Sequence, residues 1–142
     1  YYDYESIGGD CTNFASQCIY AGAGVMNYTP TFGWYYINAN DKAPAWTGVE
    51  YLYNFLTRRT PSTGPFAGEV SPERIRPGDI VQLSFDGTGW QHSPVVVAAD
   101  RPRSYADILV AAHSFNADDR PLSTYEFVRA RFLHIGGVYR QG

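Results

Sequence analysis

The organising segment of the chain is Gly8-Gly9-Asp10-Cys11-Thr12-Asn13-Phe14-Ala15-Ser16-Gln17-Cys18. Two glycines allow a tight turn, Asp10 supplies a carboxylate that can cap a helix, and apolar residues then recur with the spacing of one buried helix face. The segment predicts a helix over residues 10–22, with Cys11 in its first turn. There, the unpaired backbone N–H groups and the positive end of the helix dipole favour a thiolate over a thiol. We interpret Cys11 as a candidate nucleophile.

Length and composition indicate one domain of 142 residues with its own core. Because the sequence opens on Tyr1 and shows no signal peptide, we expect residues 1–142 to be a domain excised from a longer precursor. The net charge is −3 and the arginines form separated pairs, which argues against nucleic acid as a partner. No apolar run approaches the roughly 18 residues that a membrane span needs. The composition leaves the oligomeric state open.

The order of predicted elements is helices first and strands afterwards. Residues 25–45 predict an irregular segment around the aromatic run 32–36, and Thr47 then starts a second helix with the spacing of a capping box. Residues 60–73 are rich in Pro, Gly and Ser and predict a connector. Strands are expected at 80–85, 92–99, 108–113 and 125–135. This order predicts an α+β domain in which N-terminal helices pack on an antiparallel β-sheet arranged as a meander.

The histidines supply the remaining parts of a nucleophilic site. A cysteine nucleophile needs a base within hydrogen-bond reach and a third group that orients the base. His92 opens one predicted strand and His113 ends the next, and pairing across a turn at 101–105 sets them opposite each other on one face. We therefore assign Cys11 as nucleophile, His92 as general base and later acid, and His113 as the group that holds the His92 imidazole. The backbone N–H of Cys11 would bind the oxyanion, and the sequence identifies no second donor.

Several of these residue types also fit structural roles. Cys18 has the position of an ordinary core cysteine, and His134 follows apolar residues on one strand face and fits a hydrogen-bonded core histidine. The three tryptophans fit a core and a ligand groove equally well. A metal site of His92, His113 and Asp118 is an alternative, although the sequence lacks the helical motif of a zinc protease. We predict no metal and no organic cofactor.

Motifs distributed over almost the whole chain resemble the bacterial family known as the putative amidase domain. They are Gly9–Gln17, Gly33–Tyr36, Trp46–Val49, Gly78–Leu83, His92–Ser93 and Ala112–Ser114. That family is similar to the CHAP and NlpC-type cell-wall hydrolases and, more remotely, to papain. The resemblance implies a papain-like α+β fold, with Cys11 as the nucleophile at a helix start, His92 at a strand start and His113 in the third polar position.

The resemblance further implies hydrolysis of an amide bond, most naturally in peptidoglycan peptides outside the membrane. We expect an extracellular or cell-envelope thiol amidase or endopeptidase that forms an acyl-enzyme on Cys11. The substrate groove would draw on residues 32–36 and 114–120, and Arg120 could meet a substrate carboxylate. The predicted substrate-binding residues are Asp10, Trp34, Trp90 and Arg120. The alternative is a catalytically silent module that binds cell-wall glycopeptide on the same fold.

Overall fold

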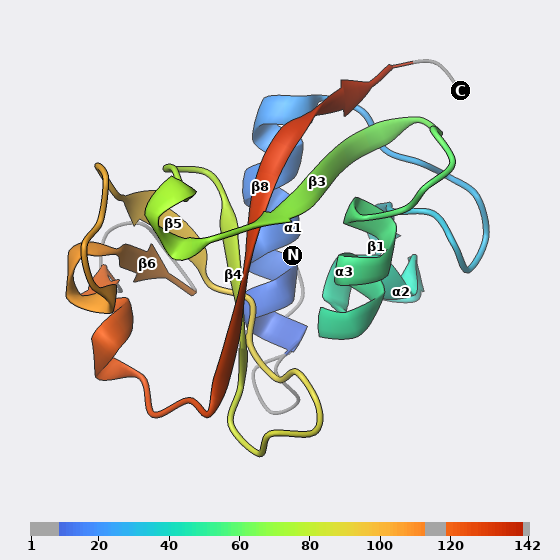
Figure 1. Cartoon of the computed structure of the whole chain (residues 1–142). Helices are drawn as coiled ribbons and strands as arrows, with labels where there is room; N and C mark the ends of the chain where they lie inside the picture. Colours follow the sequence, from blue (N-terminus) through green and yellow to red (C-terminus); the bar gives the residue numbers. More distant parts are fainter. Residues whose placement is uncertain (1–8, 113–118, 141–142) are drawn as a thin grey trace.

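The computed structural model describes residues 9–112 and 119–140, with side chains from residue 11 onward. Helices α1, α2 and α3 lie on one face of a six-stranded antiparallel sheet (Figure 1). The chain is therefore α+β, as the order of the predicted elements indicates.

The helical layer confirms the first predicted helix and corrects the second. Helix α1 (Gly9–Ala23) begins and ends within a residue of its predicted bounds. The second helix is divided into α2 (Pro44–Thr47) and α3 (Val49–Leu56). Thr47 ends α2, and α3 is preceded by Gly48, which has no side chain to cap it, so the predicted capping box is wrong. The helix forms because its apolar face is buried, not because of a cap.

The segment between α1 and α2 is less irregular than the sequence predicts. It contains a two-stranded hairpin, β1 (Tyr36–Asn38) and β2 (Asp41–Lys42). An isolated bridge joins Asn27 to Trp34 just before this hairpin. The hairpin is short and its β1 residues are largely exposed, so it leaves no alternating pattern in the sequence.

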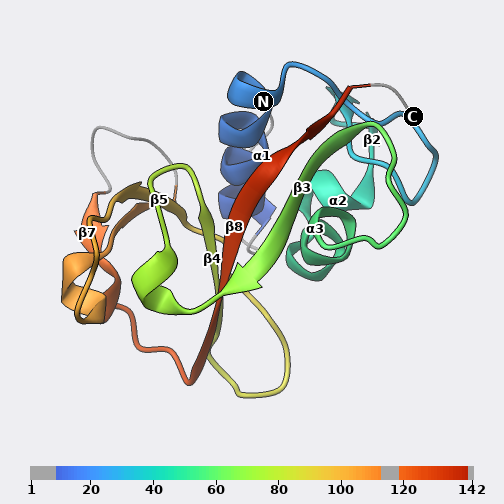
Figure 2. The ribbon, with the colours of Figure 1, turned by 45° about the horizontal axis from the view of Figure 1, so that its top comes forward.

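The six-stranded sheet has the order β3-β8-β4-β5-β6-β7, with β3 nearest the α2–α3 pair and β7 at the opposite edge (Figure 2). Strands β4 to β7 form the predicted meander. Strand β8 then returns to lie between β3 and β4, so a meander describes only part of the sheet. Short 3-10 turns join the strands. The strands are β3 (Gly64–Val70), β4 (Ile80–Ser84), β5 (Val95–Ala98), β6 (Leu109–Ala111), β7 (Arg120–Pro121) and β8 (Arg129–Tyr139).

Strand β3 lies where the composition predicts a connector, and that prediction is wrong. The strand pairs with β8 from Gly64 opposite Tyr139 to Val70 opposite Phe132. As the edge strand it tolerates Pro65, which lacks an N–H donor, because one side of an edge strand needs no partner. Its pairing partner is remote in sequence, so local composition gives no sign of it.

The register between β5 and β6 also differs from the prediction. Strand β5 begins only after Pro94, and Val95 pairs with Ala111. This pairing is one residue away from the register that sets His92 opposite His113, so the predicted register is wrong. His92 instead forms an isolated bridge with Leu83 of β4, and His113 lies outside the described residues.

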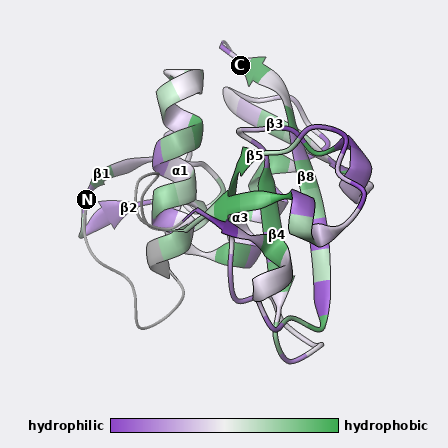
Figure 3. Cartoon of the chain, turned by 90° about the vertical axis from the view of Figure 1, so that its left-hand side faces the viewer, coloured by the Kyte–Doolittle hydropathy of each residue, from purple (hydrophilic) through white to green (hydrophobic). Residues whose placement is uncertain are grey.

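Two apolar clusters cover the two faces of the sheet. Residues of β4 alternate between them: Ile80 joins the cluster under the helices, and Val81 joins the cluster on the other face. Figure 3 shows the hydrophobic colouring concentrated on the central strands β4 and β5. The helix-side cluster comprises Ala15, Ile19, Trp34, Ala45, Trp46, Leu52, Phe55, Leu56, Ile80, Val95 and Leu133. The start of α1 therefore lies against the helix-facing side of β4 and β5.

Candidate active site

Cys11 lies in the first turn of α1 and faces the sheet. The residue is 1% exposed, and its Sγ accepts a hydrogen bond from the backbone N–H of Ser93 at 3.4 Å. The N-terminus of a helix carries partial positive charge, and an N–H aimed at sulfur favours the thiolate over the thiol. Two main-chain features, the helix start and the Ser93 amide, thus act on the same sulfur.

The Ser93 side chain is fully buried beside this sulfur and is held from two directions. The Thr12 hydroxyl donates to Ser93 Oγ at 3.2 Å, and Gln82 Nε2 donates to the same oxygen at 3.1 Å. Ser93, whose N–H contacts Cys11, therefore links α1 to β4 through its hydroxyl group.

Gln82 is a fully buried polar residue in the middle of β4. Its Nε2 also donates to the Val49 carbonyl oxygen at 2.9 Å, at the start of α3. Its Oε1 accepts two hydrogen bonds from Arg131, from Nε at 2.9 Å and from Nη2 at 2.7 Å. Every partner agrees with this orientation of the amide, because Val49 offers only an acceptor and Arg131 only donors.

Arg131 closes the network on the solvent side. Its side chain is 10% exposed and forms an ion pair with Glu50 at 2.9 Å. The guanidinium carbon lies 3.6 Å from the ring centre of Tyr53 and 4.1 Å from that of Trp90. Stacking between two rings restrains the guanidinium, which then presents two donors to Gln82.

The His92 ring packs against aromatic side chains. Its centre is 5.3 Å from the ring of Tyr125 and 6.2 Å from that of Phe85. Its backbone pairs with Leu83, which belongs to the cluster on the sheet face away from the helices. The structure thus brings Cys11 to Ser93 and the His92 ring to Tyr125, and a hydrogen bond between Cys11 and His92 stays a prediction.

The loop that carries Trp90 and His92 is fixed by Asp86. Its carboxylate accepts backbone N–H bonds from Thr88 and Gly89, each at 2.9 Å. These bonds, to Gly89 and then Thr88, lower the pKa of Asp86 to about 2. At neutral pH the carboxylate is ionised, and the loop is held in the conformation that positions Trp90 beside Arg131.

Residues 1–135 match the model of the family described as Putative amidase domain. The chain belongs to this family. A Bacillus subtilis (strain 168) protein named Uncharacterized protein YhbB is 32% identical over 143 aligned residues, which take in 93% of this chain. The chain covers 44% of that relative's length. No solved structure matches the chain.

The predicted substrate-binding residues of the amidase domain have different environments. Trp34 has no exposed surface and its Nε1 donates to Ser16 Oγ at 3.1 Å, so a ligand has no access to it and we assign it to the core. Trp90 is half-buried beside the site network. Arg120 is exposed, and its Nε donates a hydrogen bond to the Thr124 hydroxyl. Its guanidinium carbon lies 3.7 Å from the ring centre of Tyr125. The side chain of Asp10 lies outside the described residues.

The aromatic run 32–36 does not act as one unit. Phe32 is 82% exposed and lines a cavity of about 480 Å³ together with Tyr51 and Arg59, on the outer side of α3. Tyr36 packs on Trp46 with ring centres 5.9 Å apart. The run therefore supplies one exposed ring, at Phe32, next to rings that stabilise the fold.

Two residues given structural roles are clarified by their contacts. Burial raises the pKa of Cys18 to about 11, which agrees with a structural cysteine. His134 is hydrogen-bonded, with Nδ1 2.9 Å from Asp79 Oδ2, but its side chain is 46% exposed. The predicted hydrogen bond is confirmed. The predicted core position is wrong, because the side chain at position 134 of β8 faces outward.

Sequence reasoning missed Gln82 and Arg131 as site residues and gave Ser93 no role of its own. A buried glutamine within the apolar strand 80–84 was a usable signal, because such a side chain needs partners for both of its polar ends. The identity of those partners depends on the pairing of β4 with β8, in which Gln82 lies opposite Arg131. That pairing joins segments 49 residues apart.

The structure also bears on metals and membranes. Within residues 9–112 and 119–140, His, Cys, Asp and Glu side chains form no group of three or more arranged to hold a metal ion. The alternative metal site also includes His113 and Asp118, which lie outside these ranges. None of the helices in the described part of the amidase domain combines the length and apolarity that crossing a bilayer requires.

Proposed function

We propose that this amidase domain hydrolyses amide bonds through an acyl-enzyme on Cys11. Membership of the family supports amide hydrolysis. The observation that carries the choice of nucleophile is the Cys11 sulfur at the start of α1, 3.4 Å from the backbone nitrogen of Ser93. A helix terminus and an aimed N–H are the surroundings that make a cysteine nucleophilic near neutral pH.

In the proposed reaction the Cys11 thiolate attacks the amide carbonyl carbon. The oxyanion forms beside the backbone N–H of Cys11, the C–N bond breaks, and the leaving amine takes a proton from His92. His92 then removes a proton from water, which attacks the thioester and releases the acid together with the Cys11 thiolate. We propose His113 as the group that orients the His92 imidazole.

We further propose a papain-like relationship to the CHAP and NlpC-type hydrolases, and peptidoglycan peptides as the substrate at the cell envelope. The resemblance of the segments around Cys11 and His92 to the putative amidase domain, a family similar to those hydrolases, supports this relationship. Trp90 offers a half-exposed ring beside the site, and Arg120 offers a cation to the carboxylates that such peptides carry.

A silent binding module remains the second candidate, and one observation favours it. Cys11 is 1% exposed, so a substrate carbonyl has little access to its sulfur. A binding module would retain the fold and the aromatic side chains without turnover.

The deciding experiment is release of new amines and carboxylates from peptidoglycan fragments, followed by mass spectrometry. We expect Cys11→Ala to lower turnover at least about a thousandfold, because the covalent step is lost. Cys18→Ala is the matched control on the same helix and should keep turnover. Quenched wild-type reactions should contain an acyl adduct on the Cys11 peptide.

Two results would reject the proposal. Undiminished turnover in Cys11→Ala would remove the sulfur from the mechanism. Equal binding of fragments by wild type and Cys11→Ala, with turnover in neither, would favour the silent module. Comparing His92→Ala with His113→Ala tests the histidine roles, because loss of the base should slow the reaction more than loss of its orienting partner.

A further inference from the structure

We propose that Arg131 is a positioning residue for the reactive sulfur: acting through Gln82, it holds Ser93 so that the Ser93 main-chain N–H stays on Cys11 Sγ. The inference rests on the proposed function of Cys11 and deepens it. It assigns a role to a buried polar network that joins α1, α3, β4 and β8.

The first step is that Gln82 is held in one orientation. Val49 accepts from Nε2 at 2.9 Å, while Arg131 donates twice to Oε1 at 2.7 and 2.9 Å. Rotating the amide would place donor against donor and acceptor against acceptor in a fully buried site. Arg131 therefore fixes the direction of the Gln82 donor.

The second step is that Gln82 and Thr12 together fix Ser93. Both donate to Ser93 Oγ, at 3.1 and 3.2 Å, and so fill the two acceptor positions of that hydroxyl. Ser93 lies just before the short strand β5 and is anchored through this side chain. Anchoring the side chain fixes the direction of the N–H group, which donates to Cys11 Sγ at 3.4 Å.

The third step is that Arg131 is rigid enough to act in this way. Its side chain is 10% exposed, lies between the rings of Tyr53 and Trp90, and is tied to Glu50. The guanidinium is restrained from both faces as well as by its hydrogen bonds.

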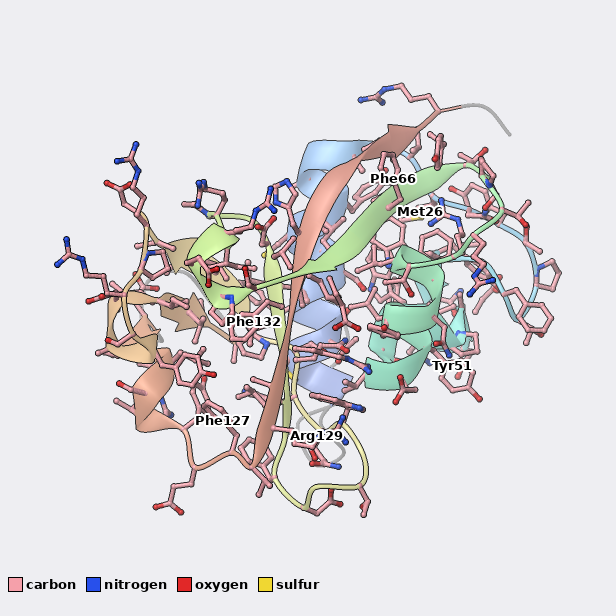
Figure 4. The ribbon with its side chains drawn as sticks, viewed as in Figure 1. Met26, Tyr51, Phe66, Phe127, Arg129 and Phe132 are labelled. Atoms are coloured by element: carbon pink, nitrogen blue, oxygen red, sulfur yellow. The ribbon has the colours of Figure 1, made fainter. Side chains whose placement is uncertain are left out.

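A neighbouring arginine provides the matched comparison. Arg129 extends from the same strand near its lower end (Figure 4), and its guanidinium also lies over Trp90, at 4.9 Å. Unlike Arg131, it donates to the Gly87 carbonyl oxygen at 3.4 Å. The two arginines share strand, charge and aromatic partner, but Arg131 bonds Gln82 and Arg129 bonds Gly87.

The test is the rate of iodoacetamide alkylation at Cys11 against pH, measured on the full chain by peptide mass spectrometry. We expect Arg131→Met to move the midpoint of the profile upward by about one pH unit and to slow alkylation at pH 6.5 about tenfold, because an N–H bond to the thiolate is weakened. Ser93→Ala should change the rate in the same direction, since the anchor of residue 93 is lost. Arg129→Met should match wild type, and Arg131→Lys should fall between.

The outcomes separate this inference from the proposed function. If wild-type Cys11 titrates as an ordinary thiol, the proposed nucleophile fails. If wild-type Cys11 reacts quickly and Arg131→Met behaves like Arg129→Met, only the positioning role is overturned. Circular dichroism and the inertness of Cys18 report whether each variant is folded. Should Arg131→Met unfold, an unchanged profile in Ser93→Ala overturns the inference on its own.

Discussion

Cys11 and Cys18 lie on the same helix but in different electrostatic surroundings. Cys11 receives an N–H bond at the helix start, where partial positive charge is greatest. Cys18 lines a cavity of about 370 Å³ together with Ile19 and Val138, and its burial disfavours the charged form. We therefore expect position along the helix, and not residue type alone, to decide which of the two thiols reacts.

We predict that Cys18 stays unmodified when Cys11 is alkylated near neutral pH. Burial raises the pKa of Cys18 to about 11, so its thiol remains protonated until the solution becomes strongly alkaline. Peptide mass spectrometry over pH 6 to 11, as a rough range, gives the two rates separately. A Cys18 profile with its midpoint near that of an ordinary thiol would contradict the assigned burial.

Single elements show where local sequence determines structure and where it does not. The segment around Cys11 contains its own turn, helix spacing and stop signal, so α1 is predictable. Strand β3 contains Pro65 and Gly68, and its strand structure depends on pairing with β8. The hydrogen bonds between Arg131 and Gln82 cannot be predicted from local sequence for the same reason, because they form only when β8 pairs with β4.

The loop closed by the Asn27–Trp34 bridge gives a prediction for Gly33. A Cβ at this position would lie 2.3 Å from the Asn27 carbonyl oxygen and 2.4 Å from that of Thr29. These are backbone atoms of a turn held by the Asn27–Trp34 bridge and cannot move aside cheaply, so Gly33→Ala should lower the free energy of unfolding by at least about 2 kcal/mol.

The control for Gly33 is Gly68, in the edge strand β3. A Cβ there meets nothing within 4 Å, so Gly68→Ala should change the free energy of unfolding by no more than about 0.5 kcal/mol. Urea unfolding followed by tryptophan fluorescence measures both variants. Equal effects of the two substitutions would mean that the close backbone approach at Gly33 is absent in solution.

At the scale of the whole molecule, one sheet separates two apolar clusters. Leu133 of β8 is fully buried in the helix-side cluster, directly opposite Ile80 of β4. The helix start that carries Cys11 rests on this same face of the sheet. Loss of packing there should therefore affect global stability and the site together.

We predict that Leu133→Ala lowers the free energy of unfolding by about 2–5 kcal/mol, the usual cost of a cavity in a packed core. Val128→Ala, at a residue that is 65% exposed just before β8, should cost about 0.5 kcal/mol or less. Thermal melting with calorimetry tests both. A Leu133→Ala variant as stable as Val128→Ala would show that the helices do not pack on β8 as described.

The central place of β8 has a consequence for the order of events during synthesis. It is the last of the described strands to leave the ribosome, yet it lies between β3 and β4. Ser93 is 82 residues from Cys11, and contacts between such distant segments form late in folding. While translation continues, the emerging chain holds Cys11 without the strand that completes its surroundings. The proposed hydrolase would thus gain its reactive thiol only once β8 has emerged and paired with β3 and β4.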